Sequence, residues 1–106
     1  MNAFAVLAEP SRRALLDALV DGAQSVSVLV ERVGMSQPVV SKHLRILRDA
    51  GIVTVKPDGQ RRLYCINPEP LREVDDWLTP YRALWSARLD ALAQHLDERH
   101  GRKTDE

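Results

Sequence analysis

The chain lacks several features that would place it in common functional classes. Its 106 residues include one cysteine, Cys65, so a single chain has neither an internal disulfide framework nor a multi-thiolate metal site. Lysine plus arginine balance aspartate plus glutamate at 15 each, so the net charge gives no indication of nucleic-acid binding. No apolar run reaches transmembrane length, and the apolar segment at residues 3–8 is too short for a signal peptide. We therefore expect a soluble, unprocessed cytoplasmic protein that does not act at a membrane.

The sequence also lacks the arrangements by which enzymes are recognised. It has no glycine-rich phosphate loop, no nucleophile with a matched base and no acid pair placed in a defined cleft. His43 is the candidate base, but it falls at the edge of an expected helix, where we expect it to pack or to hydrogen-bond. Cys65 falls in the middle of an expected strand, which favours a small buried hydrophobic residue over a redox centre. We therefore expect neither catalysis nor a cofactor.

Positive charge is concentrated in one part of this balanced chain. Residues 36–62 carry six cations and two anions, a net charge of +4, whereas residues 1–35 carry −1 and residues 63–106 carry −3. The six cations are Lys42, Arg45, Arg48, Lys56, Arg61 and Arg62. Arg12 and Arg13 lie outside this region, and for them phosphate contact and simple solvation are equally open. A DNA-binding protein needs such a local excess of cations on the surface that contacts the phosphates.

The stretch SQPVVSKHLRILR, residues 36–48, predicts a helix with two unlike faces. Ser36 is a suitable N-cap and Gly51 supplies the stop. Three apolar residues at i, i+4 and i+7 form one stripe that faces the core, namely Val40, Leu44 and Leu47. The opposite face collects Gln37, Pro38, Ser41, Lys42, Arg45 and Arg48. Such groups can bond base edges and phosphates in a major groove, although a merely solvated basic face would show the same pattern.

Two helices are expected near the N-terminus. Residues 2–8 predict a short apolar helix that ends before Pro10, and its Phe4 and Leu7 need something to cover them. Pro10 suits the first turn of a second helix that runs to Val20. The expected core positions of this second helix are Leu15, Leu16 and Leu19.

A third helix completes a helix-turn-helix unit with the helix at residues 36–48. Ser25 is the expected N-cap of a helix over residues 26–33, and Gly34 is its expected end. Only Met35 separates that glycine from Ser36. A tight glycine-containing turn between two helices is typical of this unit, in which the second helix enters the groove.

After Gly51 the period changes from that of a helix to that of a strand. The runs IVTVK and RRLYCIN flank residues 57–60, whose Asp-Gly step predicts a β-hairpin. A hairpin directly after a recognition helix is a wing, and its cations Lys56, Arg61 and Arg62 suit phosphate or minor-groove contact. Tyr64 and Ile66 are expected to pack.

The C-terminal part predicts a long helix with a broad apolar stripe. Leu71, Leu78, Trp85 and Leu92 recur every seven residues, and the stripe is widened by Val74, Trp77, Tyr81, Leu84, Leu89 and Leu96. Such a stripe should bury part of itself against another subunit. Pro80 is expected to kink or interrupt the helix, with Thr79 as a candidate new cap. The tail at residues 101–106 is expected to be disordered.

These elements predict a mainly α fold with a β-hairpin wing, a winged helix-turn-helix. We expect one domain over residues 1–106, with a DNA-binding core at 9–67 and dimerisation helices at 1–8 and 68–100. The predicted DNA-binding residues are Ser36, Gln37, Pro38, Ser41, Lys42, Arg45, Arg48, Lys56, Arg61 and Arg62. The predicted dimer interface consists of Phe4, Leu7, Leu71, Trp77, Leu78, Tyr81, Trp85, Leu89 and Leu92.

Three stretches carry a resemblance to a known family. LAEPSRRALLDALV, SQPVVSKHLRILRDAGIV and DGQRRLYCINPE resemble, in consecutive order, the second helix, recognition helix and wing of the ArsR/SmtB bacterial repressors. The resemblance covers about residues 3–98. It implies a homodimer built from the first and last helices, an imperfect palindromic double-stranded DNA site across two major grooves, and repression relieved by an inducer. The family's base-contacting positions fall on Gln37, Pro38, Ser41 and Lys42, with Arg45 beside them.

The sequence departs from the family's metal-sensing patterns. Metalloid-sensing relatives carry a Cys-x-Cys pair at the start of the third helix, where this chain has Ser25 and Ser27. Because neutral hydroxyls cannot replace thiolates as soft ligands, we expect no thiolate metal site there.

A second family site lies on the last helix, patterned as Asp-x-His, ten residues, then His-x-x-Glu. His95 and Glu98 reproduce its second half, but Arg82 and Leu84 stand where Asp and His are required. His95 and His100 point about 140° apart on a helix and cannot hold one ion together. We expect no metal, and the inducer is unknown.

The sequence leaves two other functions open. One is a metal-responsive repressor with an atypical site, and the other is a winged-helix module that binds protein. The serine, glutamine and cations on the outer face of residues 36–48 disfavour protein binding, because a protein-binding face usually carries exposed apolar residues.

Overall fold

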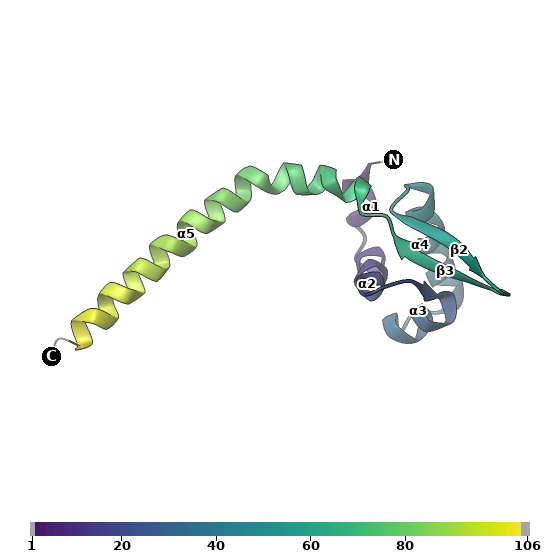
Figure 1. Ribbon diagram of the computed structural model, residues 1–106, viewed down its shortest axis with the longest axis horizontal. Coiled ribbons are helices and arrows are strands. Elements are labelled where there is room, and N and C mark those ends of the chain that lie inside the picture. The colour runs from purple at the N-terminus through teal and green to yellow at the C-terminus, as the bar shows by residue number, and fades with distance from the viewer. Residues whose placement is uncertain (1, 105–106) are drawn as a thin grey trace. The chain divides into compact units, whose positions relative to one another are not determined.

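The computed structural model describes the backbone of residues 2–104 and the side chains of residues 2–99, and the chain forms two compact units (Figure 1). The first unit covers residues 1–74 and the second covers residues 75–106. The first unit contains α1 (Ala3–Leu7), α2 (Pro10–Leu19), β1 (Gln24–Ser25), α3 (Val26–Val33), α4 (Gln37–Asp49), β2 (Val53–Asp58), β3 (Arg61–Ile66) and η1 (Glu69–Leu71). Helix α5 (Arg72–Thr104) begins in the first unit and continues into the second.

The core of the first unit confirms the predicted faces of α2 and α4. The buried apolar side chains of these helices are Leu15, Leu16, Leu19, Val40, Leu44 and Leu47. Leu29 of α3 and the hairpin residues Ile52 and Val53 complete the cluster. In α1 the buried residues are Ala3 and Val6, whereas Phe4 is 37% exposed and Leu7 is half-buried.

The predicted start and end of α3 are confirmed. Ser25 is the N-cap, and its Oγ accepts a hydrogen bond from the backbone N–H of Val28 at 3.4 Å. Gly34 ends the helix in the left-handed region at φ 69°, where its N–H donates to Val30 O at 3.1 Å. A glycine adopts this conformation without the steric cost that a Cβ would add. The turn into α4 is therefore as short as the sequence indicates.

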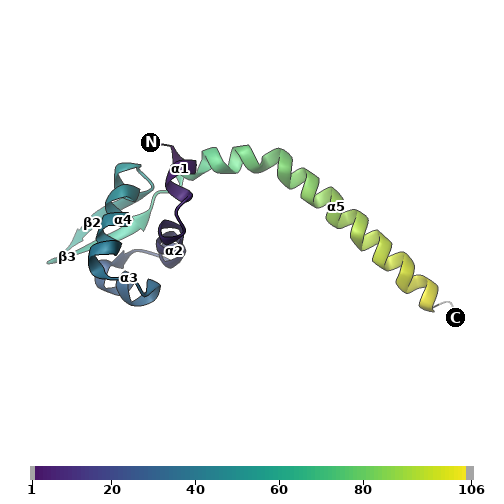
Figure 2. The ribbon, with the colours of Figure 1, turned by 180° about the vertical axis from the view of Figure 1, so that it is seen from behind.

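The hairpin belongs to a three-stranded antiparallel sheet of order β1-β3-β2. Sequence reasoning did not predict β1, in which Gln24 pairs with Tyr64 and Ser25 with Leu63. This short strand joins the start of α3 to the base of the wing. Figures 1 and 2, which view the molecule from opposite sides, show the β2–β3 hairpin lying against one side of α4.

The turn of the hairpin is shorter than residues 57–60. Pro57 pairs with Arg62 and Asp58 with Arg61, so only Gly59 and Gln60 remain in the loop. Gly59 has φ 62°, the positive value that a two-residue hairpin turn requires at its first central position. Pro57 is tolerated because β2 is an edge strand.

Packing along β3 differs from expectation at one residue. Tyr64 and Ile66 pack against the core as predicted. Cys65 is half-buried rather than buried, because the alternation of a strand turns it away from the core. Its Sγ lies 3.0 Å from Oγ1 of Thr54 on the neighbouring strand.

Helix α5 runs without interruption through Pro80. Of the two expected effects of Pro80, a kink or an interruption, the interruption with a new cap at Thr79 is therefore wrong. The Oγ1 of Thr79 donates to the backbone oxygen of Asp75 at 3.2 Å, and Nη2 of Arg82 donates to the same oxygen at 2.7 Å. Pro80 leaves the backbone oxygen of Asp76 without its helical N–H partner, and these two side-chain bonds lie at the neighbouring carbonyl of Asp75. None of the described helices combines the length and apolar character needed to cross a bilayer.

Two expected boundaries also differ. The expected core ended at residue 67, but Leu71 and Val74 pack against the core of the first unit. Leu7 and Leu71, both assigned to a dimer interface, thus contact the core of their own chain. The helix continues to Thr104, beyond the expected end at residue 100, while residues 105 and 106 lie outside the described part.

Candidate nucleic-acid interface

The outward face of α4 presents all of its predicted DNA-binding residues. Val40, Leu44 and Leu47 are at most 1% exposed, which fixes the rotation of the helix about its axis. The exposed residues on the other side include all six predicted ones and the anion Asp49, namely Gln37, Pro38, Ser41, Lys42, Arg45, Arg48 and Asp49, with Ser36 preceding them. Hydroxyl and amide groups therefore lie near the N-terminal end and cations lie further along.

The beginning of α4 leaves backbone donors available. Ser36 occupies the N-cap position, but its side chain makes no capping hydrogen bond. Pro38 in the first turn has no N–H to satisfy, which suits this position. The remaining N–H groups at a helix start attract anions, and a phosphate placed there would be favoured by the helix dipole.

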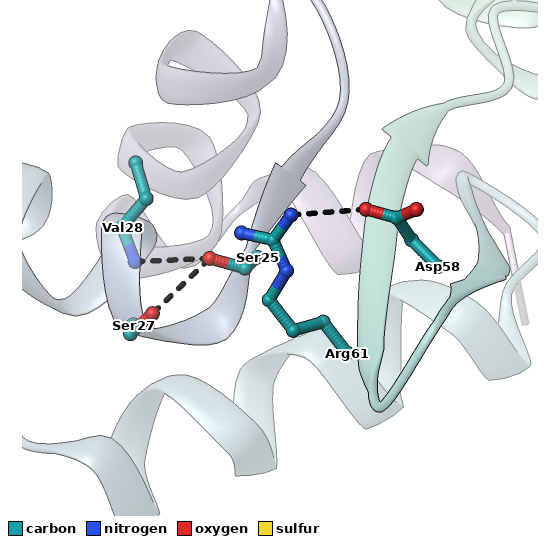
Figure 3. Close-up of polar contacts among 5 residues, drawn as sticks. All are labelled: Ser25, Ser27, Val28, Asp58 and Arg61. Atoms are coloured by element: carbon teal, nitrogen blue, oxygen red, sulfur yellow. Dashed lines mark hydrogen bonds and ion pairs between the residues drawn. The ribbon is translucent and has the colours of Figure 1, made fainter.

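The wing carries its three cations on the surface, because Lys56, Arg61 and Arg62 are all exposed. Nη2 of Arg61 pairs with the carboxylate of Asp58 at 3.0 Å, and both side chains are more than half exposed (Figure 3). An exposed ion pair of this kind contributes little to stability, so Arg61 can exchange Asp58 for a phosphate at small cost.

A cavity of about 340 Å³ joins the recognition helix to the wing. It is lined by Ser41, Arg45, Arg48, Asp49, Arg62 and Tyr64. Sequence reasoning assigned Tyr64 to packing alone and did not select Asp49. The sequence did indicate a place for Tyr64 in the site, because residues two apart on a strand share a face and Arg62 is a predicted DNA-binding residue. A second hollow, of about 400 Å³, lies along α4 beside Pro38, Lys42 and Ile46.

A third cavity lies between the start of α3 and the wing, and it contains the position of the family's thiolate site. It measures about 310 Å³ and is lined by Ser25, Val26, Ser27, Gln60, Arg61 and Arg62. The hydroxyl oxygens of Ser25 and Ser27 lie 3.1 Å apart and share a hydrogen bond (Figure 3). Two neutral hydroxyls beside two arginines do not fit a soft metal ion.

The other metal candidates lie on α5, where His95 and Glu98 are exposed. Across the described residues, no three His, Cys, Asp or Glu side chains gather closely enough to hold an ion. The side chain of His100, the third histidine of the chain, lies outside the described part.

His43, the candidate base, is half-buried on the inner edge of α4. Its Nδ1 lies 3.5 Å from Nη1 of Arg12, so it makes the polar contact that was expected. Arg12 and Arg13 also donate to backbone oxygens, Arg12 to Val6 O and Arg13 to Leu7 O, each at 2.6 Å. Sequence reasoning did not predict these bonds, because they join residues of different helices.

Comparison with known proteins identifies a domain and relatives. A family described as "Helix-turn-helix domain" matches residues 7–56. The HTH-type transcriptional regulator Rv2034 of Mycobacterium tuberculosis is 34% identical over 96 residues, which cover 91% of this chain and 87% of that protein. The transcriptional repressor SdpR of Bacillus subtilis is 31% identical, with 73% of this chain and 86% of that protein covered.

Solved structures agree with these relatives. An ArsR-like transcriptional regulator from Rhodococcus sp. RHA1 superposes with a TM-score of 0.65 at 31% identity, covering 86% of each chain. A homodimeric winged helix-turn-helix DNA-binding domain from Mycobacterium bovis, described as a possible ArsR-family regulator, has a TM-score of 0.63 at 25% identity and covers 74% of each chain. The chain belongs to the ArsR/SmtB family of winged helix-turn-helix transcriptional regulators.

Proposed function

We propose that this protein is a homodimeric, sequence-specific repressor that binds an imperfect palindrome in bacterial DNA. The observation that carries the proposal is the outer face of α4, where polar groups and cations are exposed and a buried stripe fixes their direction. The repressor SdpR supports the direction of regulation, and the homodimeric domain from Mycobacterium bovis supports the assembly. Because the relatives are transcriptional regulators, we assign no catalytic role.

We divide the proposed DNA-binding residues into two groups by the part of the duplex that each contacts. Gln37, Ser41, Lys42 and Arg45 enter the major groove, where amide and hydroxyl groups bond base edges and cations bond guanine or phosphate. Arg48 and the wing cations Lys56, Arg61 and Arg62 contact the flanking backbone or minor groove. The first group supplies sequence preference, whereas the second supplies affinity that depends on salt.

The proposed dimer uses the apolar stripe of α5. Six apolar residues on this helix are between 53% and 65% exposed, namely Trp77, Leu84, Trp85, Leu89, Leu92 and Leu96. Trp77 and Tyr81 extend the stripe, and their ring centroids lie 4.9 Å apart. The spacing from Tyr81 through Trp85, Leu89, Leu92 and Leu96 is that of a helix-pairing face. A second copy would cover this face and hold two recognition helices about 34 Å apart.

The first prediction concerns Lys42 and Arg45. Replacing both by glutamine should weaken binding to a selected duplex by about 100-fold or more, because each contact contributes about 1–3 kcal/mol. Fluorescence anisotropy measures the affinity, and sedimentation should show an unchanged dimer. Arg72→Gln is the control, because Arg72 is also exposed to solvent but begins α5 and pairs with Glu69 at 3.2 Å. Retained affinity in the double variant would contradict the assignment of this face.

The second prediction uses two opposite changes in the wing. Asp58→Asn should strengthen DNA binding by about threefold, because it releases Arg61 and removes a negative charge close to the phosphates. Arg62→Gln should weaken binding and make the slope of log K against log salt shallower by about 0.9. Each substitution should change the affinity for a specific duplex and for a random duplex by the same factor. Changes confined to one sequence would show that the wing reads bases and not backbone.

The third prediction tests the stripe on α5. Trp85→Ala should raise the dimer dissociation constant by about 30-fold, because a buried tryptophan is a typical interface hot spot. DNA affinity should fall with it, since the dimer positions both recognition helices. Gln94→Ala is the matched control, because nine residues along the helix is roughly 180° around it. If Trp85→Ala leaves dimerisation and DNA binding unchanged, the stripe does not form the interface.

A further inference from the structure

Arg12 of α2 makes polar contacts with two other helices at once. Its Nε donates to the backbone oxygen of Val6 in α1 at 2.6 Å. Its Nη1 lies 3.5 Å from Nδ1 of His43 in α4. Val6 is 1% exposed, so the α1 end of this contact is anchored in the core. One guanidinium therefore joins α1 to the recognition helix.

The chemistry of the two side chains fixes their roles. A guanidinium has five N–H donors and no acceptor, so Nδ1 of His43 must accept. The imidazole is then neutral, with its proton on Nε2. His43 lies between Lys42, which faces outward, and Leu44, which is buried in the core. A bond at this position ties the flank of α4, between its outward and buried faces, to α2 and α1.

The surroundings favour this arrangement of charge. Glu9 is the N-cap of α2, and its carboxylate accepts a hydrogen bond from the backbone N–H of Ser11 at 3.3 Å. That bond, together with the nearby charge of Arg12, lowers the pKa of Glu9. The ionised Glu9 offsets part of the charge of Arg12.

We propose that Arg12 and His43 are a positioning pair, which sets the orientation of α4 relative to α1 and thereby couples dimerisation to DNA affinity. The inference rests on the proposed function, because α1 matters here as one of the helices assigned to the dimer. Arg12 is then a link between helices and not a phosphate contact. This role differs from both alternatives that the sequence left open for Arg12, phosphate contact and simple solvation.

The chain offers a matched control in the adjacent residue. Arg13 also donates to the last turn of α1, from Nη1 to Leu7 O at 2.6 Å. Among the described contacts, that of Arg12 with His43 continues to α4, whereas the hydrogen bond of Arg13 ends at α1. Arg12→Lys and Arg13→Lys therefore make the same chemical change, but only Arg12→Lys removes a guanidinium that contacts α4.

The experiment combines a spectroscopic and a binding measurement on the full chain. In ¹⁵N NMR spectra of the wild type, His43 should show an unprotonated Nδ1 and a protonated Nε2. Arg12→Lys should disturb this pattern and Arg13→Lys should not. This measurement needs no DNA, so it reports on the link even if the proposed function fails.

DNA affinity is then measured on a duplex that the wild type enriches from a random pool. Arg12→Lys and His43→Leu should each weaken binding by about 10-fold with an unchanged dimer and an unchanged salt slope. The double variant, Arg12→Lys with His43→Leu, should bind DNA no more weakly than either single variant, because both substitutions break the same contact between Arg12 and His43. His43→Asn, whose Oδ1 can replace Nδ1 as acceptor, should restore the affinity to within about threefold of wild type.

Several results would overturn the inference. A protonated Nδ1 in wild-type His43 would exclude the hydrogen bond. Unchanged affinity in Arg12→Lys and His43→Leu, or additive losses in the combined variant, would exclude coupling. A salt slope shallower by about 0.9 in the variant Arg12→Gln would make Arg12 a phosphate contact. Failure of the wild type to enrich any duplex would instead contradict the proposed function and, with it, the coupling to DNA affinity.

Discussion

Burial of one apolar stripe on α4 is the constraint on which the rest of the interface depends. Val40, Leu44 and Leu47 are each at most 1% exposed, and they pack in one cluster with Leu15, Leu19 and Leu29. Truncating such a side chain to alanine typically costs about 2–5 kcal/mol, a large part of a small domain's stability. The helix consequently has one rotation, and the direction of every polar group on its other side follows from the packing.

The parts of the fold that depend on local chemistry were predictable. Ser25 and Gly34 delimit α3 because capping and left-handed backbone are properties of single residues. Strand β1 was not predictable, because two residues pair with a strand almost forty positions later and carry no period of their own. Nor was continuity through Pro80 predictable, because a proline inside a helix normally kinks or breaks it, and here α5 continues on both sides.

The candidate site shows the same division. Periodicity predicted which residues of α4 are exposed, because the stripe and the outer face are two sides of one pattern. Periodicity could not place Arg62 and Tyr64 beside Arg45 and Arg48 in one cavity, since that requires the docking of the hairpin on α4. Nor could it find the contact between Arg12 and His43, which are 31 positions apart. Side-chain bonds between helices form only after the core has set the distances.

The central claim is that the outer face of α4 and the wing, presented by two copies of the chain, bind double-stranded DNA. The most direct test titrates the wild-type protein against a duplex that it enriches from a random pool, with salt varied and stoichiometry measured. We expect saturable binding of two chains per duplex, with log K falling linearly and steeply against log salt. Absence of saturable binding, a flat response to salt, or one chain per duplex would contradict the account.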